Sequence, residues 1–432
     1  MRTIASSLCI VLSASILLTT ALGAQDDERR PPPTHASLDI PVKGNGLSIG
    51  NSLGVNGLRI NFRDDDLRWV NGINLTLWQP RDNRDAIING LALGIVSPHA
   101  GTINGLAVGV GAPVIEHEMN GLSVGVFASV ANGAVNGLSV GGLASVVNGD
   151  VNGFGVGGLA SVTNGGVSGM SVGGLAAVTN GRSTGLQVGG LASVTNGSMT
   201  GINVGGLATI TGGDMKGIGA SLGANVASGS YDGLSAGLLA TVVNGRANGL
   251  FIGGLATVIN GGTTGLSVGG LASVHSGHLS GVHVAGLAVV GSEDVEALVV
   301  GGLAAVAGRD LKGFAVGGLA VVAGGRIEGA AFSVGAVQAG EHLKGFAVGG
   351  YKVEADDVRG LIIAAIRTRV HWDMTGVAIA GYNHIHGVQR GLTIGLYNRA
   401  EELHGIQIGL LNYAGNNKGI WRWMPIVNAH LN

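Results

Sequence analysis

NGLSVGGLASVVNGDVNGFGVGGLASVTNGGVSG, residues 136–169, contains one sixteen-residue phrase twice. A glycine recurs at this interval from Gly105 to Gly281 and again from Gly313 to Gly345, after which the spacing loosens. Counted from that glycine as position 1, the unit reads Gly-Leu-Ser-Val-Gly-Gly-Leu-Ala-Ser-Val-x-Asn-Gly and ends with three variable residues. Self-similarity at a fixed period is the signature of a repeat architecture, in which each unit packs against its neighbours.

Each unit has the pattern of β-strands. Positions 2 and 4 are apolar in almost every unit, and this alternation is typical of a strand. No apolar stripe with a helical period competes with it, and each mid-segment glycine would cost a helix about 1 kcal/mol. The chain is therefore predicted to be all-β.

Two all-β architectures can use such a unit: a β-solenoid with one coil per unit, or a closed transmembrane β-barrel with one strand per unit. Successive barrel strands run in opposite directions, so their turns should differ with a period of two units. The turns VVNGDVNG, VTNGGVSG and VTNGRSTG instead follow one another as equivalents, and aromatic girdles are missing. The sequence favours a single-chain β-solenoid of about 20 coils, with the barrel as the alternative.

The solenoid also predicts which residues point inward and where the chain bends. A coil of sixteen residues has a perimeter of only about 50 Å, so the chain must turn more than once in each unit. The Gly-Gly and Asn-Gly pairs suit these bends, because Gly tolerates positive φ and Asn the left-handed region. In the unit that starts at Gly137, the predicted interior residues are Leu138, Val140, Leu143 and Val146, and the predicted bend residues are Gly141, Gly142, Asn148 and Gly149.

Composition excludes several classes of protein. The 432 residues include 82 glycines, and 46 % are hydrophobic while only 12 % are charged. Flexible Gly-rich linkers and disordered chains lack this many large apolar residues. The net charge is −2 and no Lys/Arg cluster offers a phosphate-binding footprint, so no nucleic-acid partner is expected.

Motifs for catalysis or cofactor binding do not stand out from the repeat. Strings such as GFGVGG (153–158) resemble dinucleotide loops only in their glycine content, since no helix is predicted after them. No P-loop lysine, HExxH motif or nucleophile elbow stands out. We therefore expect no catalytic residues, no cofactor and no enzymatic activity.

Residues 1–24 have the features of an export signal. Met1 and Arg2 precede an apolar run that ends in small residues, and cleavage after Gly23 or after Ala24 fits that end; a retained single-span anchor is the alternative. The only cysteine, Cys9, lies in this run, so the mature chain is expected to lack disulfides. Residues 25–43, with three consecutive prolines, are predicted to be a polar, extended tether.

The rest of the chain divides by its regularity. The predicted segments are irregular coils and a cap at 44–104, regular repeats at 105–359, irregular repeats at 360–416 and a C-terminal cap at 417–432. Caps are needed because a stacked sheet exposes backbone edges at its ends. Four of the five tryptophans lie in 67–87 and 417–432, and the second stretch contains Trp421 and Trp423. These stretches are predicted to cap the sheet, with partner-binding aromatics as the alternative.

Motifs near both ends resemble a known class of repeat protein. NGLSIG (45–50), INGLALGIVSP (88–98) and GLTIGLYNRAEELHGIQIGLLNYAG (391–415) are similar to the exported surface-repeat proteins of bacteria built on a G-[LV]-x-[IV]-G-L-x-N unit. The resemblance implies an exported, cell-surface or outer-envelope protein and brings no activity. The middle of the chain departs from that unit, so its asparagine occurs only as Asn383, Asn398 and Asn412, which are predicted to stack into a short ladder.

Histidines and charges gather in the last coils. His384 and His386 alternate on one strand as two metal ligands would. The weak candidates for metal ligands are His371, His384, His386 and His404, and a second histidine group is His275, His278 and His283. Without cysteine and with few nearby carboxylates, exposed or corner histidines are favoured over a metal site. The charged coils 345–405 are the candidate partner surface, with simple solubility of a terminal region as the alternative.

The sequence thus favours an exported structural or interaction protein without catalytic activity, a rigid rod at the cell surface, the outer membrane or in the periplasm. An outer-membrane β-barrel pore is the alternative, and membrane insertion is less favoured than a soluble rod. The partner is expected to be an envelope component, a matrix or a protein, and its identity stays open.

Overall fold

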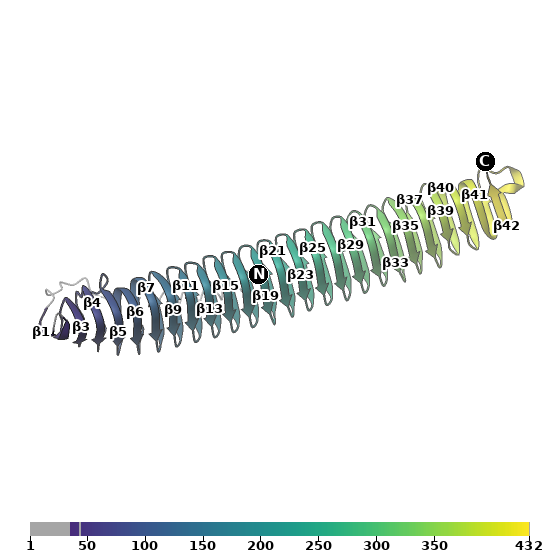
Figure 1. Cartoon of the computed structure of the whole chain (residues 1–432). Coiled ribbons are helices and arrows are strands. Elements are labelled where there is room, and N and C mark those ends of the chain that lie inside the picture. Colours follow the sequence, from purple (N-terminus) through teal and green to yellow (C-terminus); the bar gives the residue numbers. More distant parts are fainter. Residues whose placement is uncertain (1–34, 43–44, 432) are drawn as a thin grey trace, which may run out of the picture.

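The computed structural model describes residues 35–42 and 45–431 and shows a long, slightly curved rod (Figure 1). The chain is a β-solenoid of about 22 turns, here called coils, with a period of roughly sixteen residues, and 70 % of it is strand. The prediction of an all-β solenoid is confirmed. The alternative of a closed barrel is wrong, because successive units stack in parallel along the rod. The predicted export signal at 1–24 lies outside the described residues.

A regular coil consists of one long strand, a bend, one short strand and a second bend. β11 (Val151–Gly157) and β12 (Ala160–Thr163) make one such coil. β11 pairs in parallel with β9 (Ala134–Gly141) of the coil before and with β13 (Val167–Gly173) of the coil after. Like residues therefore stack in rows along the rod, and a long-strand sheet faces a short-strand sheet.

The strands before the regular coils are β1 (Ser37–Val42), β2 (Asn45–Gly50), β3 (Gly54–Asn61), β4 (Trp69–Thr76), β5 (Ile87–Gly94), β6 (His99–Gly109) and β7 (Val114–Gly125). The other long strands are β15 (Ser183–Gly189), β17 (Met199–Gly205), β19 (Met215–Ser221), β21 (Tyr231–Gly237), β23 (Ala247–Gly253), β25 (Thr263–Gly269), β27 (Leu279–Ala285), β29 (Val295–Gly301), β31 (Leu311–Gly317), β33 (Ile327–Ser333), β35 (His342–Gly349), β37 (Asp357–Ala364) and β39 (Met374–Ile379). The other short strands are β8 (Ala128–Ala131), β10 (Ala144–Val147), β14 (Ala176–Thr179), β16 (Ala192–Thr195), β18 (Ala208–Thr211), β20 (Ala224–Ala227), β22 (Ala240–Val243), β24 (Ala256–Ile259), β26 (Ala272–His275), β28 (Ala288–Gly291), β30 (Ala304–Ala307), β32 (Ala320–Ala323), β34 (Ala336–Ala339), β36 (Lys352–Ala355) and β38 (Arg367–Val370). The last elements are β40 (Tyr382–Ile394), β41 (Tyr397–Ala414), the 3-10 turn η1 (Gly419–Arg422) and β42 (Trp423–His430).

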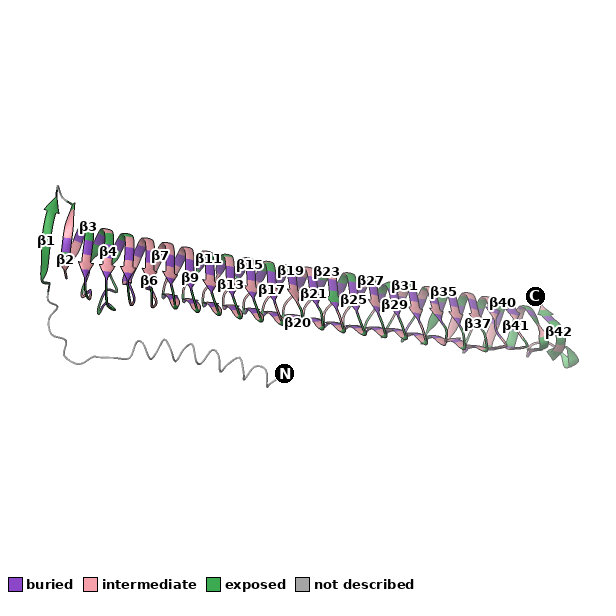
Figure 2. Ribbon diagram, turned by 90° about the horizontal axis from the view of Figure 1, so that it is seen from below, coloured by how far each residue is buried: buried purple, intermediate pink, exposed green. Residues whose placement is uncertain are grey.

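Burial alternates along the strands, but the buried positions are not the predicted ones (Figure 2). In the coil that starts at Gly137, the side chains of Ser139, Ser145 and Val147 are buried, whereas Leu143 is 49 % exposed. The inward orientation predicted for Leu138, Val140, Leu143 and Val146 is therefore wrong. The interior is lined by positions 3, 5, 9, 11 and 15 of the unit.

The small cross-section of the coil explains this arrangement. A Cβ atom at Gly141 would overlap the carbonyl oxygen of Ala144, so the two sheets converge there and leave room only for glycine and small residues such as Ser145. The interior widens toward the other bend, where Val135 and Val147 are buried. Leucine does not fit on the narrow side, and it lies on the outside of the rod instead.

The predicted bends are present, but their glycines are required by close backbone contacts and not by a positive φ. Gly142 lies in the bend between β9 and β10, Asn148 and Gly149 lie in the bend between β10 and β11, and Gly141 ends β9. These three glycines lack a positive φ, and a Cβ at Gly142 would overlap a carbonyl oxygen of the preceding coil. Positive φ occurs at position 1 of the unit, as at Gly137 (136°).

Antiparallel strands cover both ends of the stacked sheets. β1 pairs with β2, so Ser37–Val42 belongs to the fold and not to an extended tether as predicted. The stretch 67–87 is not the N-terminal cap, because it contributes β4 and a loop to the coils behind that edge. β42 pairs antiparallel with β41 at the other end, and it lies within the stretch 417–432 that is predicted from the sequence as the C-terminal cap. The reversed direction of both strands stops the parallel stacking.

The interior changes its chemistry along the rod. Apolar residues dominate it in three stretches, 67–167, 199–259 and 279–400. Between the first two, and at both ends of the rod, buried polar side chains fill the interior instead. In the described part of the chain, no helix has the length and apolar character needed to cross a membrane.

Candidate interaction surface

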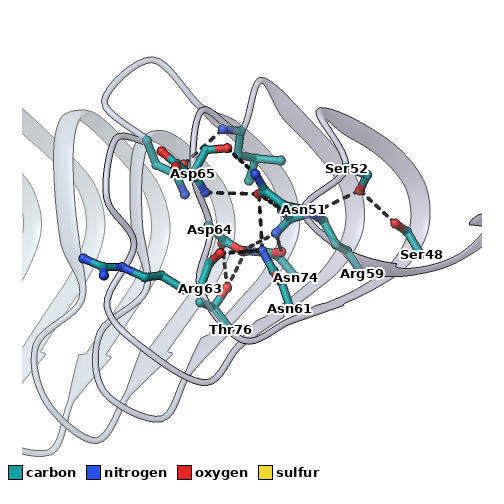
Figure 3. Close-up of polar contacts among 12 residues, drawn as sticks. Ser48, Asn51, Ser52, Arg59, Asn61, Arg63, Asp64, Asp65, Asn74 and Thr76 are labelled. Atoms are coloured by element: carbon teal, nitrogen blue, oxygen red, sulfur yellow. Dashed lines mark hydrogen bonds and ion pairs between the residues drawn. The ribbon is translucent and has the colours of Figure 1, made fainter. Parts of the chain in front are cut away.

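A buried polar network closes the interior at the N-terminal end (Figure 3). Arg59 on β3 is fully buried and forms an ion pair with Asp64 in the loop between β3 and β4. The Asp64 carboxylate also accepts hydrogen bonds from Asn61 Nδ2 (2.9 Å), Asn74 Nδ2 (3.0 Å) and Thr76 Oγ1 (2.6 Å). Because these groups are buried, a partner cannot reach them, and the network serves as a structural plug.

Sequence reasoning missed this plug. Arg59 and Asn74 are aligned in neighbouring coils at position 3, where regular units carry a small residue such as Ser139. A charged residue at this position, followed by the acidic run 64–66, was the available signal. The prediction that positions 2 and 4 point inward places position 3 on the solvent side, where charged residues are common.

The C-terminal face comprises the outward side chains of the short-strand sheet between residues 352 and 413. In regular coils this sheet presents Ala and Val, as at Ala160 and Val162 of β12. In the last coils aromatic, basic and acidic side chains replace them. The C-terminal face consists of Lys352, Glu354, Arg367, Arg369, His371, Tyr382, His384, His386, Tyr397, Arg399, Glu401 and Tyr413. Most of it lies within the predicted partner surface 345–405.

Charges on the C-terminal face are linked across coils through Glu354. This carboxylate accepts a hydrogen bond from Lys352 Nζ (2.7 Å) and lies 3.3 Å from His371 Nε2 and 3.9 Å from Arg369 Nη1. Burial alone would raise the pKa of Glu354, but the hydrogen bond and charge of Lys352, with His371 and Arg369, lower it below its usual range. Glu354 is therefore ionised at neutral pH and links its own coil to the next one through Arg369 and His371.

Aromatic rings form a row along the C-terminal face. The ring centroids of Tyr382 and Tyr397 are 5.0 Å apart with planes at 7°, and those of Tyr397 and Trp423 are 6.2 Å apart with planes at 4°. The Arg399 guanidinium lies 5.3 Å from the centre of the Tyr413 ring, a cation–π contact. The row thus connects the last coils to the cap strand β42.

The two cap tryptophans keep exposed side chains. Trp421 in η1 is 59 % exposed and Trp423 at the start of β42 is 50 % exposed. The cap is therefore made by backbone pairing of β42 and not by burial of these indoles. Both side chains keep exposed surface, although the Trp423 ring also packs against Tyr397 and Tyr413.

The structure brings three of the four candidate metal ligands close together. The ring centroids of His384 and His386 are 3.8 Å apart and those of His371 and His386 are 5.7 Å apart. His404 lies elsewhere, with its Nε2 2.7 Å from Glu402 Oε1. Burial, helped by His386, Arg399 and Arg369, lowers the pKa of His384 to about 4. Within 35–42 and 45–431, no group of three or more His, Cys, Asp or Glu has the arrangement to hold a metal ion.

The second histidine group is split between the interior and the surface. His275 and His283 are fully buried inside the rod, with ring centroids 5.0 Å apart. Burial lowers the pKa of His275 to about 3, with a contribution from His283, and lowers the pKa of His283 itself to about 4. His278 lies outside, 4.0 Å from a Glu296 carboxylate oxygen. The buried pair is neutral at physiological pH and belongs to the core.

The predicted asparagine ladder is present inside the last coils. Asn383 Nδ2 donates to Asn398 Oδ1 at 2.7 Å, and Asn398 Nδ2 donates to Asn412 Oδ1 at 2.7 Å. All three side chains are buried, and Asn412 also donates to the Met424 carbonyl oxygen of the cap (3.1 Å). The ladder therefore satisfies the polar interior behind the C-terminal face and ties it to β42.

A row of exposed leucines follows the bend between long and short strands. We call it the leucine ridge: Leu143, Leu159, Leu175, Leu191, Leu207, Leu239, Leu255, Leu271, Leu287, Leu303 and Leu319, which are between 44 % and 62 % exposed. The opposite bend is polar. There Asn164 Nδ2 donates to Asn148 Oδ1 (2.6 Å) and Asn180 Nδ2 donates to Asn164 Oδ1 (2.7 Å). The rod is thus amphipathic across its width.

Comparison with known proteins adds no relative to this description. A scan against protein-family models, a search of curated proteins and a search of solved structures each found no match.

Proposed function

We propose that this chain is an exported structural or interaction protein, a rigid rod of the cell surface or envelope that has no catalytic activity. The fold supports the rod, because the coils stack in register through backbone pairing over the whole described chain. The features of residues 1–24 and the resemblance to exported surface-repeat proteins support export.

The observation that carries the proposal is the position of the C-terminal face at one end of a rod whose short-strand sheet presents a uniform outer surface in the regular coils. The short-strand sheet presents only small apolar side chains over many coils and then changes to Arg, His, Glu and Tyr next to the cap. Such a surface suits recognition, since aromatic and Arg side chains dominate binding hot spots. The regular coils hold this face at a fixed distance from the N-terminal end.

The cations of the C-terminal face point to a partner with acidic groups. Arg367 is aligned between Lys352 and Tyr382, and it forms no side-chain ion pair with any described residue. Arg399 is held by Glu401 (2.8 Å) and stacks on Tyr413. A carboxylate or phosphate group of an envelope polymer or protein can pair with Arg367 while apolar parts contact the neighbouring rings.

Charge reversal on the C-terminal face tests the proposal. The double variant Arg367→Glu/Arg399→Glu is compared with Arg182→Glu/Arg246→Glu, which makes the same charge change at exposed sites of the regular coils. Binding to washed cell envelopes of the source organism is measured by cosedimentation. We expect at least a tenfold loss for the first variant and retention for the second. Equal binding by both variants contradicts the assignment of the C-terminal face.

Export is tested separately by mass spectrometry of the N-terminus. An exported chain that begins at Ala24 or Gln25 supports the predicted signal. A chain that retains Met1 and stays inside the cell contradicts export, whatever the envelope assay shows.

A further inference from the structure

The leucine ridge is held rigidly by its own backbone. Leu159 N donates to Leu143 O and Leu175 N donates to Leu159 O, both at 2.7 Å, and the same bond continues to Leu191 and Leu207. From Leu143 to Leu207 the backbones of successive ridge residues are therefore one strand spacing apart, about 4.8 Å, and the row is interrupted at Gly223 before it resumes at Leu239. A surface that is ordered before binding loses little conformational entropy when it is covered.

The apolar strip extends beyond the leucines at both ends of the rod. The same bend carries Val126 (59 % exposed) and Ile95 (55 %) on the N-terminal side, and Ile366 (56 %) and Leu396 (63 %) on the C-terminal side. Over about 22 coils this strip is on the order of 100 Å long, and a width of roughly 10 Å gives it about 1,000 Å². Soluble monomers rarely expose one apolar patch of this size.

We propose that the leucine ridge is the interface along which two copies of this chain lie side by side. A long row of leucines at the coil spacing, interrupted at Gly223, is matched along its length by a partner with the same spacing, and a second copy has that spacing. The strip of about 1,000 Å² per copy exceeds the roughly 800 Å² per partner that a stable complex buries. The inference concerns assembly and is independent of what the C-terminal face binds.

The distribution of charge permits this pairing. Between Glu118 and Glu293 the charged residues are Asp150, Arg182, Asp214, Lys216, Asp232 and Arg246, equal in number of each sign. All of them lie at or next to the opposite, polar bend, so two ridges meet without repulsion. A lipid surface is disfavoured as occupant, because membrane-binding surfaces place Lys and Arg beside their apolar residues and the ridge has none in these coils.

The ends of the rod direct the association to its side. β1 and β42 cover the two sheet edges in antiparallel orientation, so end-to-end stacking of coils is blocked. The polar bend carries stacked asparagine amides, which are hydrated and provide no hydrophobic driving force for association. The long-strand sheet also exposes apolar side chains, such as Phe154 (48 %) and Phe314 (41 %), but these vary in size from coil to coil, whereas the ridge repeats leucine.

Sedimentation velocity of the full exported chain tests the pairing. The ridge variant Leu159→Lys/Leu175→Lys/Leu191→Lys is compared with Ser168→Lys/Thr184→Lys/Thr200→Lys, which adds the same charges at exposed positions of the same coils. We expect dimers for the wild type and the control at micromolar concentration, and at least a hundredfold weaker association for the ridge variant. Circular dichroism establishes that each variant retains its β structure.

Single cysteines provide a test that does not depend on the lysine variants. The natural chain has only Cys9, so Leu143→Cys, Leu239→Cys and Leu319→Cys are introduced singly in a Cys9→Ser background and oxidised. Two parallel copies are expected to crosslink at all three positions, and two antiparallel copies only at the central Leu239. Thr200→Cys, on the other side of the coil, is expected to stay uncrosslinked.

Three results would overturn the proposal. A wild-type chain that sediments as a monomer even at tens of micromolar refutes the proposal. Dimerisation that is equally strong in the ridge variant refutes it as well. Flotation of a monomeric chain with vesicles of phosphatidylethanolamine and phosphatidylglycerol, lost in the ridge variant, would assign the ridge to lipid instead. None of these outcomes depends on envelope binding by the C-terminal face, so the two proposals can fail separately.

Discussion

Gly153→Ala is expected to disrupt the solenoid locally, although it adds one methyl group to a Gly-rich strand. Gly153 lies at position 1 of its unit with φ at 134°, a conformation that side chains other than glycine rarely adopt. A Cβ there would also overlap the carbonyl oxygen of Gly137 in the preceding coil. Since these two residues are aligned partners of β11 and β9, the overlap can be relieved only by separating the coils.

The magnitude follows from these two effects. A backbone conformation that is confined to glycine costs another residue about 1–3 kcal/mol. Separation of the coils weakens the neighbouring interstrand hydrogen bonds, each worth about 1 kcal/mol. With two such bonds lost, the free energy of opening this coil falls by about 3–5 kcal/mol.

Gly155→Ala is the matched control, two residues away on the same strand. A Cβ there meets only Ser161 Oγ, at 3.3 Å, and the aligned residues Ser139 and Ser171 already carry a side chain at this place. Alanine restricts the unfolded chain while its Cβ lies slightly close to Ser161 Oγ, so these two opposing effects are expected to leave the free energy of opening within about 1 kcal/mol of the wild-type value.

The assay is hydrogen exchange measured by mass spectrometry on peptides that cover 137–169. Exchange reports the free energy of local opening, which suits a repeat protein whose coils need not unfold together. Gly153→Ala should exchange much faster in these peptides and normally at the rod ends. Equal exchange in the two alanine variants would show that the position 1 glycines are not required by backbone geometry.

Three further perturbations test the interior of the rod. Asp64→Asn leaves the Arg59 charge buried without its counter-ion, so the N-terminal coils should lose about 3–5 kcal/mol of opening free energy by hydrogen exchange. Burial lowers the pKa of His275 to about 3 and that of His283 to about 4, below the value near 6.5 of histidine in the unfolded chain. The contribution of the neutral pair to stability is therefore complete above pH 6.5 and is lost as the pH falls toward 4. Urea unfolding at pH 7 and pH 4.5 should show this dependence for the wild type, and the variant His275→Val/His283→Val should not show it. Asn398→Ala leaves buried amides unpaired, so proteolysis near the C-terminus should accelerate in line with a cost of about 1–3 kcal/mol, whereas an unchanged cleavage rate would argue against a stabilising ladder.

The period of the sequence was enough to predict the architecture, but hydrophobicity was not enough to orient the strands. Leu138 and Val140 alternate with Ser139 and Gly141, and either set is compatible with a strand that has one buried face. Side-chain volume decides between them, because the interior beside Gly141 is too narrow for leucine. In repeats that carry small residues on one strand face, the buried face is therefore predicted better from side-chain volume than from hydrophobicity.

The candidate sites were predictable to different degrees. The asparagine ladder was accessible because Asn383, Asn398 and Asn412 recur in register, and stacking follows from repetition alone. The links of Glu354 to His371 and Arg369 depend on how neighbouring coils align, which the loosened spacing after residue 360 conceals. The sequence was therefore enough to locate the C-terminal face as a charged region, but not to predict which of its side chains contact one another.

The register of the parallel strands makes rod length a discrete variable. Because Gly137 is aligned with Gly153 and Gly153 with Gly169, removal or insertion of one complete unit leaves every remaining residue opposite an equivalent partner. Gain or loss of a whole unit therefore changes the length of the molecule in steps of about 4.8 Å without altering its ends. The distance between the N-terminal plug and the C-terminal face is thus set by the number of units, and a change in that number leaves the surfaces at either end intact.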